Sequence, residues 1–78
     1  MNSLYSMVIQ WSQEDGCFVV FLPEFAGLVM QPCTDGKTYE EAAKHGEEAI
    51  ASLIEWLQAE GMSLPDPKTI PQQPLSVA

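Results

Sequence analysis

The sequence predicts an α+β fold, in which a three- or four-stranded antiparallel sheet carries one long helix on one face. Two short apolar segments flank an Asp15-Gly16 pair, which favours the positive φ angles of a tight hairpin turn. Only one stretch, from Tyr39 to about Glu60, repeats its apolar residues at helical spacing. Four prolines follow Met62 and exclude a second helix.

The first two segments predict the paired strands of the sheet. In the segment from Tyr5 to Ser12, apolar side chains alternate with more polar ones, as in a strand with one buried face, which we expect to lie against the helix. The next segment, Cys17 to Leu22, is apolar at every position. It is therefore expected to be central, or to be covered by the helix on one face and by a partner on the other.

A loop and a short third strand are expected between this strand and the helix. Pro23 lacks a backbone donor and Gly27 tolerates unusual backbone angles, so residues 23–27 should end the second strand. The apolar run from Leu28 to about Gln31 then predicts a third strand, which Pro32 ends.

The helix has clear start and stop signals. The Thr38 hydroxyl is positioned to cap its first turn, and Glu41 is expected to reach back to the amide of the cap residue. Gly61 suits the left-handed position after the last turn. One stripe of apolar and small residues should be buried against the sheet, namely Ala42, Ala43, Gly46, Ala49, Ile50, Leu53, Ile54 and Leu57.

The chain divides into a domain at residues 1–67 and a proline-rich tail at residues 68–78. The proline-rich stretch that follows Met62 is expected to lie extended over the core. Pro74 to Val77 predicts a short edge strand in the same subunit or in a partner, with a disordered tail as the alternative.

Length and charge restrict the function. A chain of 78 residues buries only about 60% of its unfolded surface, so we expect a homodimer or homotetramer. Eleven acidic residues face three lysines, giving a net charge of −8, which disfavours nucleic acid and favours either a basic partner or a solvated acidic surface. No apolar run is long enough for a membrane span and no export signal begins the chain, so a cytoplasmic protein is expected.

No catalytic, cofactor-binding or metal-binding residue is predicted. Cys17 and Cys33 lack metal-ligand spacing and are interpreted as reduced structural thiols. His45 is interpreted as a solvated or boundary residue of the helix. A weaker alternative gathers four carboxylates around a divalent ion for RNA hydrolysis: Asp15, Glu24, Asp35 and Asp66.

Two aromatic residues are candidates for partner contacts, whereas most of the others are expected in the core. Phe25 lies in a predicted loop, and Trp56 lies off the apolar stripe of the helix. Either side chain would suit a subunit or partner interface, unless the proline-rich tail folds over Trp56.

Taken in order, these segments resemble the HicB-like antitoxin family. The resemblance covers about residues 5–67. It rests on the strand pair around Asp15-Gly16, the Leu-Pro-Glu-Phe-Ala-Gly loop at 22–27, and Asp-Gly-Lys-Thr at 35–38 before Glu-Glu-Ala at 40–42. The last matching feature is the end of the helix at Gly61, followed by Pro-Asp-Pro at 65–67. Residues 30–34 depart from the polar, glycine-rich turn usual in the family.

The resemblance implies a partial ribonuclease-H-like fold and a non-enzymatic role. Family members of this kind bind HicA, a small basic toxin that cleaves mRNA, and mask its active site. A C-terminal DNA-binding domain found in full-length members has no counterpart here, so direct binding of nucleic acid is not expected.

We therefore predict a HicB-like antitoxin-type module that binds a basic HicA-type toxin. The alternative is an orphan HicB-like homo-oligomer with no toxin partner and no catalytic activity. Partner contacts are predicted in the loop around Phe25 and on the acidic helix face, at Glu24, Phe25, Glu40, Glu47, Glu48, Glu55 and Trp56.

Overall fold

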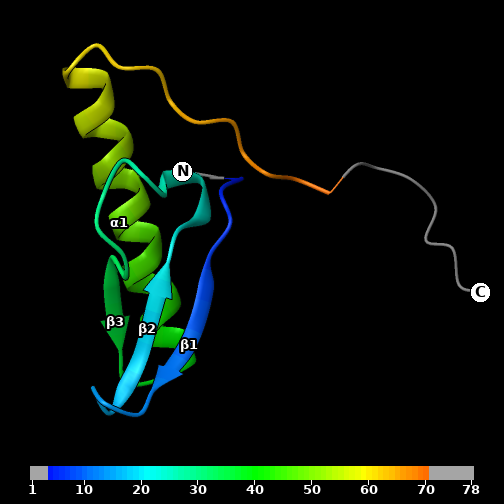
Figure 1. Cartoon of the computed structure of the whole chain (residues 1–78), viewed down its shortest axis with the longest axis vertical. Coiled ribbons are helices and arrows are strands. Elements are labelled where there is room, and N and C mark those ends of the chain that lie inside the picture. Colours follow the sequence, from blue (N-terminus) through cyan, green and yellow to red (C-terminus); the bar gives the residue numbers. More distant parts are fainter. Residues whose placement is uncertain (1–3, 71–78) are drawn as a thin grey trace, which may run out of the picture.

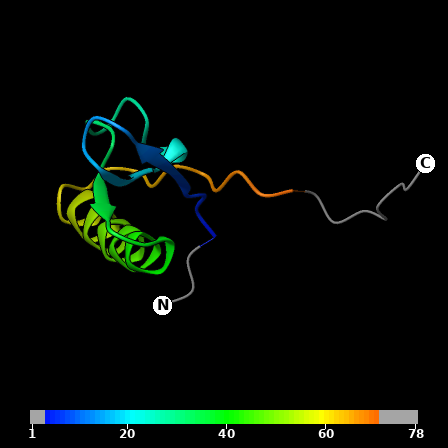
Figure 2. The same cartoon turned by 90° about the horizontal axis from the view of Figure 1, so that it is seen from below.

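The computed structural model describes residues 4–70 and shows two layers, a three-stranded sheet and one helix packed across it (Figures 1 and 2). The predicted α+β class is confirmed. The sheet is antiparallel, with the order β1-β2-β3. The elements are β1 (Val8–Ser12), β2 (Cys17–Phe21), a 3₁₀ turn (Pro23–Phe25), β3 (Thr34–Gly36) and α1 (Tyr39–Ala59).

The hairpin between β1 and β2 forms as expected, but its turn is wider than a two-residue loop. Ser12 pairs with Cys17, and the Gly16 amide donates to the Ser12 carbonyl over 2.8 Å. Gly16 has a φ of +66°, whereas Asp15 has a negative φ. The Asp15 carboxylate instead accepts the Ser12 hydroxyl over 2.8 Å. In this turn Asp15 therefore does not adopt the expected positive φ, and its side chain instead forms a hydrogen bond with Ser12.

The strand predicted at Leu28 to Gln31 is wrong, because β3 begins only at Thr34, six residues after the predicted start. The Gln31 side chain takes the place of a strand by pairing with Leu22, accepting from its amide and donating to its carbonyl, each over 2.9 Å. The Cys33 amide then donates to the Val20 carbonyl over 2.8 Å, and β3 follows. The Gln31 side chain thus provides hydrogen-bond partners for both backbone groups of Leu22, the residue that follows β2. β2 is the central strand of the sheet, as predicted.

The helix cap matches the prediction in one of its two hydrogen bonds. Thr38 Oγ1 accepts the Glu41 amide over 3.0 Å, as expected of an N-cap residue. Glu41 Oε1 accepts the amide of Lys37 over 2.9 Å, and not that of Thr38. The Glu41 carboxylate therefore binds the backbone of Lys37, the residue before the N-cap. The helix α1 begins at Tyr39.

The end of α1 leads into an extended segment that contacts Tyr5, near the start of the described residues. Gly61 has a φ of +69°, and the Met62 amide donates to the Leu57 carbonyl over 2.9 Å, so the predicted glycine exit is confirmed. The Tyr5 hydroxyl then donates to the Pro65 carbonyl over 2.7 Å. The strand predicted at 74–77 lies outside the described residues.

The core forms where the helix stripe meets β2 and the 3₁₀ turn. The sequence stripe is confirmed, since its members are buried or half-buried along α1. Fully or almost fully buried core side chains are Val20, Leu22, Phe25, Ala42, Ile50 and Leu57. Half-buried side chains at the edge of this cluster include Met7, Ile9 and Leu53.

Two glycines allow the layers to approach closely. A Cβ added to Gly36 would lie 2.7 Å from the Cα of Ala42, so β3 rests almost directly on the helix backbone. A Cβ added to Gly46 would lie 2.6 Å from Met7 Sδ and 3.2 Å from Val20 Cγ1. The first neighbour is backbone, which cannot move independently, whereas the Met7 side chain is flexible.

We expect Gly36→Ala to destabilise the fold more than Gly46→Ala. Overpacking against backbone costs about 1–3 kcal/mol, and Gly36→Ala should lie at the upper end of that range. In Gly46→Ala, movement of Met7 and a gain in helix propensity of about 1 kcal/mol offset much of the clash. Urea unfolding of both variants checks the order, and an equal or larger loss for Gly46→Ala would contradict it.

Candidate functional site

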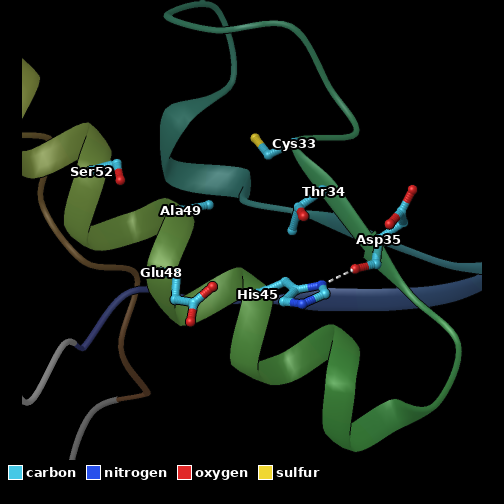
Figure 3. A pocket seen from close by; sticks show the side chains of 7 residues that line it. All are labelled: Cys33, Thr34, Asp35, His45, Glu48, Ala49 and Ser52. Atoms are coloured by element: carbon cyan, nitrogen blue, oxygen red, sulfur yellow. Dashed lines mark hydrogen bonds between the residues drawn. The ribbon is translucent and has the colours of Figure 1, made fainter.

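A groove runs between β3 and α1, with a polar end and an apolar end. The polar end is a depression of about 440 Å³, shown in Figure 3. It is lined by Cys33, Thr34, Asp35, His45, Glu48, Ala49 and Ser52. A second depression of about 260 Å³ shares Cys33, Ala49 and Ser52 and adds Val29, Met30 and Leu53. We call the two together the β3–α1 groove.

Helical spacing explains why these helix residues share one flank. The helix contributes four residues to the groove, and the last three follow His45 by three, four and seven positions: Glu48, Ala49 and Ser52. This spacing places all four side chains on one side of α1. The opposite wall is β3, the strand at one edge of the sheet. The groove is therefore formed where a sheet edge lies beside a helix flank.

His45 closes part of the free edge of β3. Its Nδ1 lies 2.6 Å from the backbone oxygen of Asp35 (Figure 3). A carbonyl oxygen only accepts, so Nδ1 must carry the proton and donate it. The half-buried position confirms the interpretation of His45 as a boundary residue. Glu48, three residues on, shares its flank, an i,i+3 relation that the sequence interpretation of His45 overlooked.

The groove contains one thiol of low reactivity. Burial raises the pKa of Cys33, although a backbone hydrogen bond from Leu22 opposes the shift. The Cys33 thiol also donates to Gln31 Oε1 over 3.3 Å. Burial, with Asp35 and Asp15 nearby, likewise raises the pKa of Cys17. Both cysteines are free, as predicted, and their raised pKa values favour the protonated thiol over the reactive thiolate at neutral pH.

The predicted partner residues of the helix are exposed along the length of α1, but they do not line one common depression. Glu48 lines the groove, while Glu40 borders a separate depression of about 320 Å³ at the start of α1. Glu47 and Glu55 are exposed elsewhere on the helix. Trp56 is 43% exposed, so its side chain remains accessible. Partner binding by these residues stays a prediction.

Phe25 and Glu24 do not form the exposed loop surface that the sequence suggested. Phe25 is fully buried and packs on Tyr5 with ring centroids 4.9 Å apart, so the expectation of an exposed aromatic anchor is wrong. Glu24 is only 7% exposed. The 3₁₀ turn directs both side chains inward, a geometry that an irregular loop assignment does not anticipate.

The buried Glu24 carboxylate joins both ends of the described chain to the 3₁₀ turn. It accepts the Ser6 amide and the Ser6 hydroxyl, each over 3.0 Å, and the Lys68 amide over 2.8 Å. Burial by itself raises the pKa of Glu24, but the amides of Lys68 and Ser6 outweigh it and lower the pKa below its ordinary value. We call this arrangement the Glu24 clasp.

The alternative of a carboxylate cluster for a divalent ion finds no support in the geometry. Among residues 4–70, no three His, Cys, Asp or Glu side chains are close enough together to hold a metal ion. Glu24 is engaged in its clasp, and Asp15 is engaged by Ser12. The four acidic residues of that hypothesis therefore do not converge.

Comparison with known proteins assigns no family. No family model matches the chain, and neither a curated protein nor a solved structure is similar to it. The HicB-like resemblance therefore remains an inference from the residues. No helix within residues 4–70 has the length and apolarity that a bilayer crossing requires.

We expect His45→Phe to lower stability while leaving the fold intact. Phenylalanine keeps the ring and has similar helix propensity, but it cannot donate to Asp35. The loss of one hydrogen bond should cost about 0.5–1.5 kcal/mol. Hydrogen exchange of the β3 amides, read by NMR, should become faster. Ser52→Ala on the same flank is the control, and equal effects of the two variants would contradict this role of His45.

We expect Glu24→Gln to destabilise the fold by about 1.5–3 kcal/mol, because the uncharged amide keeps only one acceptor oxygen and turns an NH₂ donor toward the donors that bind Glu24. A pKa lowered by folding means that the stabilisation is present above the ordinary glutamate pKa and is lost as pH falls through the folded-state pKa.

Urea unfolding at several pH values therefore checks the Glu24 clasp. The stability difference between wild type and Glu24→Gln should shrink as the solution becomes acidic. The exposed Glu55→Gln is the control, with little effect at any pH. A difference that is constant with pH would show that the charge of Glu24 contributes nothing.

Proposed function

We propose that this protein is a HicB-like antitoxin-type module that binds a small basic mRNA-cleaving toxin of the HicA type and masks its active site. In this proposal it has no catalytic activity of its own, and it acts in the cytoplasm. Its contribution is a surface whose charge and shape complement the toxin.

The observation that carries the proposal is the exposed acidic face of α1. The four glutamates predicted as helix contacts are all exposed, whereas Lys44 is the only basic residue among the described positions of α1 apart from His45. These residues are Glu40, Glu47, Glu48 and Glu55. Such a surface attracts a cationic protein and accelerates its association. It repels the phosphates of an RNA substrate.

The groove adds a feature that a merely solvated acidic helix lacks. Asp35 and Glu48 stand at its polar end, and Val29, Met30 and Leu53 line its apolar end. A partner segment with a basic residue followed by an apolar one would find a complementary site at each end. Charged rim and apolar centre are the ordinary composition of a protein interface.

The second candidate, an orphan homo-oligomer, is favoured by the sheet face that α1 does not cover. Alternation along the strands places Val8, Cys17 and Phe21 on this face. Val8 is 40% exposed, and the other two are half-buried. A second copy packed there would bury apolar surface that the isolated chain leaves in water.

A pull-down from native lysate tests the proposed function. We expect wild-type protein to retain a basic ribonuclease at low salt and to release it as salt rises, because exposed charge pairs are screened. Glu47, Glu48 and Glu55 changed together to glutamine should weaken binding, at about 0.2–1 kcal/mol for each lost charge pair.

The matched comparison uses two double variants of equal charge change. One carries Glu47→Gln and Glu48→Gln, and the control carries Glu60→Gln and Asp66→Asn, which lie away from the central face of α1. Equal weakening in both double variants would indicate attraction by net charge alone. Recovery of this chain only, as a stable oligomer seen by light scattering, would contradict the antitoxin proposal and support the orphan.

A further inference from the structure

Three aromatic side chains from three elements form a continuous ledge at the end of the sheet where α1 begins. Trp11 of β1 packs edge-on against Phe18 of β2, with centroids 5.1 Å apart and planes at 76°. Phe18 lies against Tyr39, the first residue of α1, at 4.3 Å and 34°. We call Trp11, Phe18 and Tyr39 the aromatic ledge.

The outer members of the ledge are open to solvent. Trp11 is 53% exposed and Tyr39 is 65% exposed, whereas most aromatic residues other than Phe25 and Trp56 are expected in the core from the sequence. Phe18 pairs with Gly36, which has no side chain to stand between the Phe18 ring and Tyr39. The half-buried Phe18 contacts Trp11 on one side and Tyr39 on the other, so the three rings form one connected surface.

The charge around the ledge is predominantly negative. Glu14 and Asp15 lie in the turn between β1 and β2, at the same end of the sheet as Trp11. Glu40 follows Tyr39 directly and is exposed. Two lysines lie on the same part of the chain: Lys37 is two residues before Tyr39, and Lys44 borders the same depression as Glu40 and Glu41. Exposed ring faces next to an excess of carboxylates favour a cationic ligand over an apolar one.

Cation–π attraction defines which cation fits. The faces of tryptophan and tyrosine rings carry negative electrostatic potential and attract a guanidinium or ammonium group. A guanidinium is planar and weakly hydrated, so it stacks on an aromatic face while donating hydrogen bonds to carboxylates at its edge. An ammonium group has no plane to stack. The ledge therefore suits arginine better than lysine.

We propose that the aromatic ledge is a docking surface for an arginine side chain of a basic protein partner. The inference rests on the proposed function for the identity of the partner, but not for the chemistry of the ledge. None of the three ledge residues lines the β3–α1 groove, so the ledge supplies a second contact, carried by Trp11 and Tyr39.

The ledge is tested with a blocked peptide, acetyl-Gly-Arg-Gly-Arg-Gly-amide, and with protein in which Trp56→Phe leaves Trp11 as the only tryptophan. Titration should shift Trp11 fluorescence and its indole N–H signal in the NMR spectrum. The lysine peptide should bind about two- to five-fold more weakly, and an alanine peptide should give no shift.

Matched variants separate the ring contact from simple charge attraction. Tyr39→Leu, which keeps an apolar side chain of similar reach but removes the ring face, should weaken arginine-peptide binding about two- to five-fold. Trp11→Phe, with Trp56 as reporter, should give no tryptophan response. Circular dichroism establishes that each variant is folded. Equal binding of the arginine and lysine peptides, or no effect of Tyr39→Leu, would overturn the proposal.

The outcomes for the ledge and for the proposed function are distinguishable. If a basic partner is recovered and Tyr39→Leu retains it undiminished, the ledge proposal fails while the antitoxin proposal stands. If no basic partner is recovered, the function fails and the peptide titration alone decides the ledge. A Trp11 signal that changes with protein concentration, without peptide, would assign the ledge to a second copy and overturn the proposal.

Discussion

The close approach of β3 to α1 at Gly36 is the constraint on which the other features depend. Because no side chain stands between Gly36 and the Ala42 backbone, the sheet edge lies directly beside the helix. His45, one turn further along α1, can then reach the Asp35 carbonyl. The same contact determines the width of the β3–α1 groove. It also brings Phe18, the strand neighbour of Gly36, against Tyr39.

At the other end of the sheet a polar contact has the corresponding role. The last described segment, residues 62–70, contributes no buried side chain to the core. The Glu24 clasp joins this segment and the first described segment to the 3₁₀ turn by satisfying the amides of Ser6 and Lys68. A buried carboxylate is tolerated there because donors surround it, which is the usual condition for burying a charge. One side chain thus replaces part of the stabilisation that a larger core would provide.

Local signals in the sequence were sufficient for the elements whose stabilising contacts are themselves local. The hairpin between β1 and β2, the helical stripe of α1 and the roles of Thr38 and Gly61 all follow from neighbours within a few residues. The alternation predicted for the first strand is only partly kept, because Trp11 is exposed and Ser12 is half-buried. The third strand was misplaced because its position depends on Gln31 pairing with Leu22, nine residues away. The Thr-Asp-Gly sequence of β3 has little strand propensity, so only tertiary pairing reveals it.

The candidate site shows the same division. Exposure of Glu40, Glu47, Glu48 and Glu55 follows from the helical period, which sequence reasoning captured. The burial of Glu24 and Phe25 depends on the 3₁₀ turn and on the clasp, whose partners lie 18 and 44 residues away. Trp11 and Tyr39 are exposed because no other segment of the described chain packs over their rings. Composition alone assigns such rings to the core, and only the arrangement of three elements shows that they are open.

The charge of the chain connects stability to binding. A net charge of −8 on so small a domain destabilises the compact state through self-repulsion, and the exposed helix carries much of that charge. A cationic partner on this face would relieve the repulsion and bind the folded state only, so it would raise the free energy of unfolding as its concentration exceeds the dissociation constant. The acidic surface is therefore expected to lower the stability of the isolated chain and to raise its stability in a complex with a basic protein.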